Sequence, residues 1–114
     1  MIDVNHSTWW IDSASTIHST NSLLDLRNLR KPVGAEQITY FAKKMQSHVE
    51  AIETCNLVLG SGFILKLEKT FYVPNFSRNV ISVSRLVPLR YSFFLERDSK
   101  LFYKSKHIGY GTLF

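Results

Sequence analysis

Residues 55–73 read C-N-L-V-L-G-S-G-F-I-L-K-L-E-K-T-F-Y-V, and this stretch decides the fold class. In its second half, apolar side chains recur at alternate positions, namely Phe63, Leu65, Leu67, Phe71 and Val73. A period of two indicates a strand that buries one face. The apolar run at 55–59 predicts a partner strand, and the glycines at 60 and 62 allow a tight turn between the two. The stretch is therefore expected to fold as a β-hairpin.

Strand signals continue on both sides of this hairpin. Residues 49–52 extend its first arm, whereas Pro74-Asn75 should end the second, because proline cannot donate a ladder hydrogen bond. Three more short strands, separated by polar spacers, are predicted at 91–95, 101–103 and 108–114. This spacing is typical of an antiparallel meander.

Helix signals are few. Leucines at 23, 24, 26 and 29 indicate about two helical turns, and residues 77–86 are expected to hold a short helix after a strand at 80–81. The sequence therefore predicts a mainly β fold with one or two short helices.

The bulk composition limits the class of protein. A chain of 114 residues with 45% apolar content fits one domain over 1–114, with residues 1–7 expected to be flexible. No apolar run or leader pattern indicates a membrane span or secretion, and the single cysteine, Cys55, suits a reducing compartment. The chain ends at Phe114 straight after a strand-like run, so we expect a fragment of a longer polypeptide that is intracellular.

The charge pattern gives weak support for a nucleic-acid partner. The net charge is +5, but the basic residues are scattered, whereas nucleic-acid sites concentrate them into a patch or stripe. The four histidines are dispersed and, with one cysteine, offer no zinc spacing. We therefore predict no metal and no cofactor, and interpret the histidines as structural or surface residues.

Residues 9–14, W-W-I-D-S-A, carry the candidate chemistry. An aspartic protease needs a carboxylate at the end of a buried strand, a hydroxyl that braces the loop, and then a glycine that lets the backbone approach the catalytic water. Two such loops face each other, so that one carboxyl acts as general base while the other, protonated, polarises the scissile carbonyl. Taken alone, Asp12-Ser13 is more often a turn or a helix cap.

Four motifs in order along the chain give this segment a context. They are W-W-I-D-S-A-S-T-I-H at 9–18, S-H-V-E-A-I-E-T at 47–54, F-Y-V-P-N-F-S-R-N-V-I-S-V-S-R-L at 71–86, and G-Y-G at 109–111. Over residues 8–114 the chain resembles the protease-like β-barrel domain of copia-type LTR retrotransposon Pol polyproteins, of the plant type. The resemblance implies a retropepsin-like fold, a small closed or partly open antiparallel β-barrel.

The same resemblance implies the roles of the site residues. Asp12 would be the catalytic aspartate and Ser13 the bracing hydroxyl, with Ala14 in the third position of the motif. With one such motif per chain, activity requires a homodimer, and the substrate would be a peptide of the Gag-Pol polyprotein. The protein would then act in the cytoplasm or within virus-like particles. Either the Gly60 hairpin or the 39–49 region would cover the substrate as a flap.

Three departures from the family pattern bear on activity. Ala14, Glu53 and Arg90 stand where the family has glycine, and a methyl group at position 14 is expected to crowd the catalytic water or forbid the needed backbone angle. The chain is therefore expected to be an impaired aspartic endopeptidase. The alternatives are a non-enzymatic assembly module of the polyprotein and a basic nucleic-acid-binding barrel.

Overall fold

The computed structural model describes residues 2–4, 7–24, 27–41, 45–94, 99–104 and 106–111. Its strands are β1 (Ile2–Val4), β2 (Ser7–Asp12), β3 (His18–Thr20), β4 (Leu29–Arg30), β5 (Ile38–Phe41), β6 (Met45–His48), β7 (Ala51–Val58), β8 (Ile64–Tyr72), β9 (Asn79–Ser82), β10 (Tyr91–Phe94), β11 (Ser99–Tyr103) and β12 (Lys106–Gly111). The helical segments are α1 (Val83–Leu86) and the 3-10 turns η1 (Gly34–Gln37) and η2 (Val87–Leu89). The prediction of a mainly β fold with short helices is confirmed.

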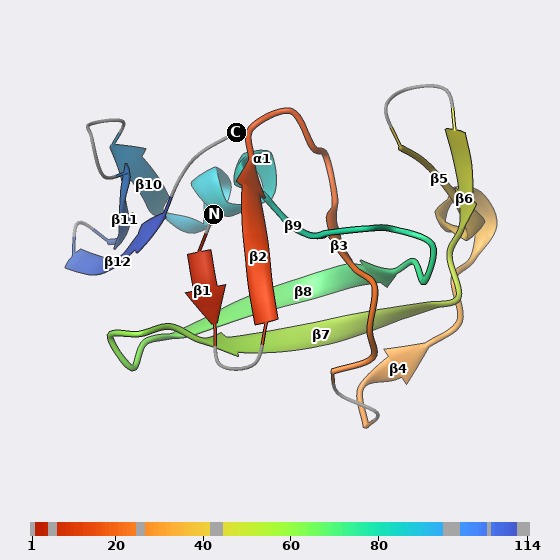
Figure 1. The fold of residues 1–114 in the computed structure, drawn as a ribbon, viewed down its shortest axis with the longest axis horizontal. Helices are drawn as coiled ribbons and strands as arrows, with labels where there is room; N and C mark the ends of the chain where they lie inside the picture. The colour runs from red at the N-terminus through yellow and green to blue at the C-terminus, as the bar shows by residue number, and fades with distance from the viewer. Residues whose placement is uncertain are drawn as a thin grey trace.

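The described strands form three sheets. The largest has the order β1-β2-β9-β3-β8-β7-β4, while β10-β11-β12 and β5-β6 form smaller sheets at opposite ends of the molecule (Figure 1). β1 and β4 are open edges of the large sheet, so these sheets do not close into a barrel. The expectation of an antiparallel β-barrel therefore needs correction, because the sheets are not closed and β2 pairs with β9 and β3 with β8 in parallel. A period of two identifies a strand but does not encode the direction of its partner.

The central hairpin is confirmed. β7 and β8 pair antiparallel down to Val58 and Ile64, and the Gly62 N–H donates to the Leu59 carbonyl at 2.9 Å to close the turn. Gly62 has a φ of +87°, a left-handed conformation that glycine adopts without strain. β8 ends before Pro74, as predicted.

A bulge interrupts the alternation in this hairpin. The register between β7 and β8 shifts between Glu53 and Cys55, opposite Lys69, whose φ is +51°. An extra residue in one strand changes which face the following side chains take. An unbroken alternation would place Thr70 on the face opposite Leu67, but after the bulge Thr70 is buried, as is Phe71.

The helix predicted over 23–29 is wrong for the residues described there. Residues 25 and 26 lie outside the described part of the chain, but Leu29–Arg30 form β4, which pairs antiparallel with β7. The backbone N–H of Leu24 donates to Glu53 Oε1 at 2.9 Å. Pairing with the long hairpin thus replaces the local helical pattern, which is too short to be stable by itself. The helix expected within 77–86 is present, restricted to α1 directly after β9.

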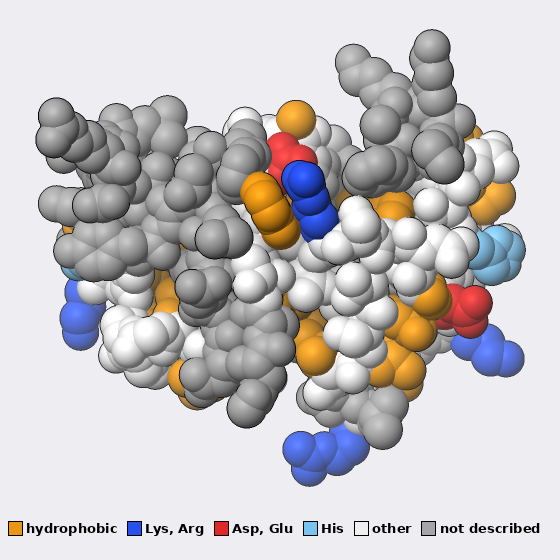
Figure 2. All heavy atoms as spheres, in the orientation of Figure 1, with side chains coloured by type: hydrophobic (Ala, Val, Ile, Leu, Met, Phe, Trp, Pro, Cys, Tyr) orange, Lys and Arg blue, Asp and Glu red, His pale blue; other side chains and the backbone are white. Residues whose placement is uncertain are grey.

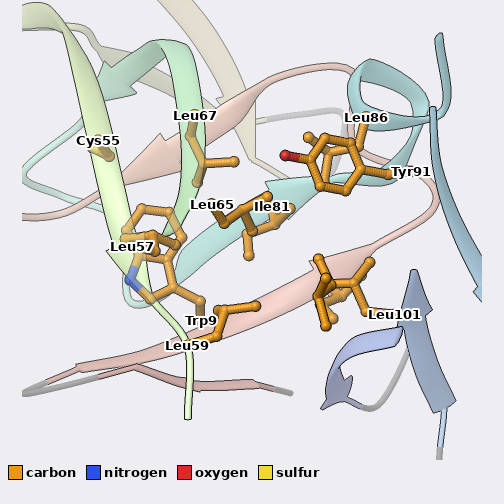
Figure 3. Packing of buried hydrophobic residues seen from close by; sticks show 12 residues of the cluster. Trp9, Cys55, Leu57, Leu59, Leu65, Leu67, Ile81, Leu86, Tyr91 and Leu101 are labelled. Atoms are coloured by element: carbon orange, nitrogen blue, oxygen red, sulfur yellow. The ribbon is translucent and has the colours of Figure 1, made fainter. Parts of the chain in front are cut away.

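The predicted meander is confirmed as β10-β11-β12, and it shares a core with the large sheet. Figure 3 shows side chains of β2, β7, β8, β9 and α1 pointing toward one another, with Tyr91 and Leu101 of the meander beside them. We call this cluster the apolar core; its buried members are Trp9, Ile11, Cys55, Leu57, Leu59, Leu65, Leu67, Ile81, Leu86, Tyr91, Leu101 and Ile108. A smaller cluster consists of Val49, Ile52, Phe71 and Val73. No helix in the described ranges is long and apolar enough to cross a membrane.

Candidate functional site

Asp12 is the last residue of β2, where that strand runs parallel to β9. Trp9 and Ile11, on the alternate positions of β2, are buried in the apolar core, and Asp12 stands opposite Ser82 in the register. Asp12 itself is half-buried, while Ser13 and Ala14 are exposed. We call residues 12–17 the Asp12 loop. The structure therefore places the three predicted site residues together at the end of a buried strand.

Short-range hydrogen bonds shape the loop. The Ala14 N–H donates to Asp12 Oδ1 at 2.8 Å, and the Ser15 hydroxyl donates to the Ile17 carbonyl at 2.7 Å. An Asp side chain that accepts from the N–H two residues on forms an Asx turn, which stabilises a sharp change of direction. The carboxylate is thus held by its own loop.

The backbone at Ala14 does not require glycine. Among the described non-glycine residues, only Lys69, Arg90 and Lys104 have a positive φ. Ala14 is therefore not strained in this conformation, and the expectation that an alanine forbids the backbone angle needed for catalysis stays a prediction. The expected crowding of a catalytic water by its methyl group stays a prediction.

Two serines, one at the end of β9 and one in α1, brace the loop. Ser82 Oγ donates to the Ser15 carbonyl at 2.6 Å, and Ser84 Oγ approaches the same oxygen at 3.3 Å. Sequence reasoning did not assign these residues a role, although the signal was present as the S-V-S of the 71–86 motif. The motif that carries the family resemblance therefore contacts the candidate site directly.

His18 lies beneath the loop at the start of β3. It is 2% exposed, and its Nδ1 accepts the Ser82 N–H at 2.9 Å. Burial, assisted by the nearby Arg85 guanidinium, lowers the pKa of His18 from 6.5 to about 3. His18 is thus a neutral, structural histidine, one of the two possibilities that the sequence left open.

Asn79, at the start of β9, joins three segments. Its Oδ1 accepts from the Thr20 hydroxyl at 3.0 Å and from the Asn21 N–H at 3.1 Å, while its Nδ2 donates to the Thr8 carbonyl at 3.3 Å. We call Thr20, Asn79, His18 and Ser82 the polar junction, because their hydrogen bonds link β2, β3 and β9. The polar junction fixes the strands from which the Asp12 loop emerges.

At Glu53 and Arg90, the other two positions where the resemblance leads us to expect glycine, the structure differs from that at Ala14. Arg90 follows η2 with a φ of +72°, a conformation that favours glycine. Glu53 is buried and accepts the Leu24 N–H, so its side chain ties the segment after β3 to β7. Of the three positions, Arg90 is therefore the one where the described backbone retains a glycine-like conformation.

Among the other aspartates, Asp3 is the one that the described ranges include, and it lies within a strand and not at its end. Asp3 pairs with Thr8 on β1, whereas Asp25 and Asp98 lie outside the described residues. Within the described ranges, no group of three or more His, Cys, Asp or Glu side chains could hold a metal ion.

The Lys and Arg side chains coloured in Figure 2 stand apart from one another on the face shown and do not form a patch. Two of them share one carboxylate, because Glu36 forms ion pairs with Arg30 at 2.7 Å and with Lys69 at 3.2 Å. Arg78 lies over the Trp10 ring at 4.1 Å from its centroid. These cations are therefore engaged within the domain.

The fold and the loop define a small mainly β domain with an acidic loop at the end of a parallel strand pair. The family model described as the Pol polyprotein beta-barrel domain matches residues 9–91. The chain belongs to this family. The match includes the Asp12 loop and the polar junction, whereas β11 and β12 lie outside it. Searches of curated proteins and of solved structures gave no match.

Proposed function

We propose that this domain is one half of a copia-type, retropepsin-like aspartic protease site that is completed by a second copy of the chain. The observation that carries the proposal is the position of Asp12, half-buried at the end of β2 in a loop braced by Ser82 and Ser84. A firmly held carboxylate at an accessible loop is what one half of a two-carboxyl site requires.

In the proposed dimer, two Asp12 carboxyls would share one proton. Like charges at close range cannot both ionise, so one carboxyl stays protonated and polarises the scissile carbonyl while the other takes a proton from water. The water then attacks the peptide carbon, and the amine leaves with a returned proton. The substrate would be an extended peptide segment of the Gag-Pol polyprotein.

For the flap we favour the hairpin formed by β5 and β6. The Gly60 turn is tied to the meander, because the Ser61 hydroxyl donates to the Ile108 carbonyl. β5 and β6 instead form a separate two-stranded sheet, which projects toward the same side as the Asp12 loop in Figure 1. Tyr40 on β5 is 59% exposed, which leaves its ring accessible to a bound peptide.

A second candidate is a non-enzymatic assembly module that uses the same self-association. Ala14 favours it, since this residue is exposed at the tip of the loop where the protease pattern places glycine. A methyl group here would narrow the space for the attacking water without disturbing the fold. The two candidates therefore differ in chemistry and not in oligomeric state.

Peptide cleavage at mildly acid pH, together with sedimentation, separates the candidates. The protease predicts a dimer whose cleavage is sensitive to pepstatin, lost in Asp12→Asn and retained in Glu68→Gln, which removes an exposed carboxylate elsewhere. A dimer that cleaves only after Ala14→Gly identifies Ala14 as the lesion. A dimer inert in both forms selects the assembly module, and a monomer inert in both forms contradicts both candidates.

A further inference from the structure

The Asp12 loop is held from below by a chain of hydrogen bonds that ends in a buried imidazole. The Ser15 carbonyl accepts from Ser82 Oγ, and the backbone N–H of the same Ser82 donates to His18 Nδ1. Ser82 thus bonds to the loop through its side chain and to His18 through its backbone N–H. Ser82 therefore connects the loop to His18.

We propose that His18 is a positioning residue that holds the Asp12 loop through Ser82. It touches no reacting atom in this role, and the inference rests on the proposed function only in treating the loop as a half-site. An imidazole can accept a hydrogen bond at Nδ1 only when that nitrogen is unprotonated, so the neutral ring must carry its proton on Nε2. In a doubly protonated ring, the Nδ1–H would point at the Ser82 N–H, so two donors would face each other and the hydrogen bond would be lost.

The surroundings of His18 preserve this acceptor in acid. Arg85 on α1 is the nearby cation, and its Nη1 is fixed by donation to the Lys69 carbonyl at 2.8 Å. On the sheet, the register places Thr70 beside His18 and Glu53 beyond Thr70. Burial and Arg85 together lower the pKa of His18 to about 3, so the ring stays neutral at the mildly acid pH at which two carboxyls share a proton.

The first test uses the wild-type protein and does not require activity. Nitrogen NMR of labelled histidine at pH 7 and pH 5 should show the His18 ring protonated on Nε2 alone at both values. Over the same range the Ser82 amide should keep its protection from hydrogen exchange. A ring protonated on Nδ1, or a Ser82 amide that loses protection at pH 5 while the fold persists, overturns the proposal.

The second test compares His18→Asn with His18→Phe. Asparagine offers a carbonyl oxygen near the place of Nδ1, whereas phenylalanine fills similar volume without an acceptor. In His18→Phe the Ser82 amide should exchange at least about tenfold faster, the scale expected for loss of one buried hydrogen bond, and the Ala14 amide signal should shift. In His18→Asn both amides should remain close to wild type.

The Gly62 amide, bonded to Leu59 in the β7–β8 turn, is the internal reference. Unchanged exchange at Gly62 together with a changed Ser82 and Ala14 supports the positioning role. Equal behaviour of the two variants, or a uniform rise in exchange at all three amides, contradicts it. If His18→Phe does not fold, the His18 tautomer and the hydrogen exchange of the Ser82 amide in the wild type decide whether the proposal holds. Because no readout depends on cleavage, failure of the protease proposal is distinguishable from failure of this one.

Discussion

The apolar core and the polar junction hold the same strands together in different ways. In the core, side chains from separate sheets, such as Leu65 of β8 and Leu101 of β11, pack into one cluster, and such packing has no fixed direction. In the junction, Asn79 and His18 join β2, β3 and β9 through hydrogen bonds of defined donors and acceptors. The core therefore supplies most of the stability, while the junction determines how β2 ends and where Asp12 lies.

Most of the buried polar residues of the described chain lie on β3 and β9, whereas Glu53 and Thr70 lie on the β7–β8 hairpin. A buried polar atom without a partner costs free energy, so polar residues are retained inside only where they bond to one another or to the backbone. Thr20 and Ser82 are fully buried, and both lie in the strands beside the candidate site. At this end of the large sheet, directional hydrogen bonds take the place of some apolar packing. Such bonds fix the position of the loop, as a preorganised site requires.

Leu65→Ala should have the largest effect on stability. Leu65 is fully buried in the apolar core, and loss of a buried leucine typically lowers the free energy of unfolding by about 2–5 kcal/mol. Ile64, the preceding residue on the same strand, is 58% exposed, so Ile64→Ala should change it by only about 0.5 kcal/mol. Urea denaturation of the two variants measures the difference. Equal losses would mean that the hairpin does not bury its Leu65 face.

Asn79→Ala should lower the free energy of unfolding by less than Leu65→Ala does, but it should also change the Asp12 loop. It removes the acceptor used by the Thr20 hydroxyl and the Asn21 N–H, and such a loss inside a protein costs about 1–3 kcal/mol. Asn75→Ala, at an exposed position after β8, is the matched control. Unlike Leu65→Ala, the Asn79 variant should also shift the amide signal of Ala14 in NMR. An unchanged Ala14 signal would contradict the role of the polar junction in supporting the Asp12 loop.

Acid should lower the free energy of unfolding of the whole domain through His18, although the ring stays neutral in the folded chain. The pKa of His18 falls from 6.5 to about 3 on folding, so between these values the unfolded chain binds a proton that the folded chain does not. Stability is therefore complete above pH 6.5 and declines as the pH falls toward 3, with a slope approaching about 1.4 kcal/mol per unit. Urea titrations between pH 6.5 and 5 avoid most carboxylate protonation. His18→Asn should flatten this slope, whereas His48→Gln, at an exposed site, should not.

The sequence predicted the parts of the fold that depend on local pattern. The β7–β8 hairpin follows from the alternation around Leu65, the glycines of the turn and Pro74. The meander follows from the polar spacers between its strands. The insertion of β9 between β2 and β3 could not be predicted in this way, because it joins segments about sixty residues apart through the side chain of Asn79. Short leucine-rich segments are likewise decided by tertiary pairing, as β4 shows.

The candidate site was predictable in its residues but not in its support. Asp12, Ser13 and Ala14 are adjacent in sequence, so their proximity needs no fold. Ser82 and His18 reach the loop only because β9 returns beside β2 and β3, and a single sequence carries no record of that pairing. A single sequence does not give backbone angles either: Ala14 and Arg90 both stand where glycine is expected, but only Arg90 has a positive φ.

Restoring the family glycines at these two positions should have opposite effects on stability. Arg90 has a φ of +72°, and a left-handed residue with a side chain costs about 1–2 kcal/mol, part of which glycine returns as greater freedom of the unfolded chain. Arg90→Gly should therefore stabilise the domain by about 0.5–1 kcal/mol. Ala14 does not have a positive φ. Ala14→Gly should therefore lower the free energy of unfolding, measured by urea denaturation, by about 0.5–1 kcal/mol. Any cleavage gained by Ala14→Gly must then come from space beside Asp12, whereas stabilisation by Ala14→Gly would show that the alanine strains the loop.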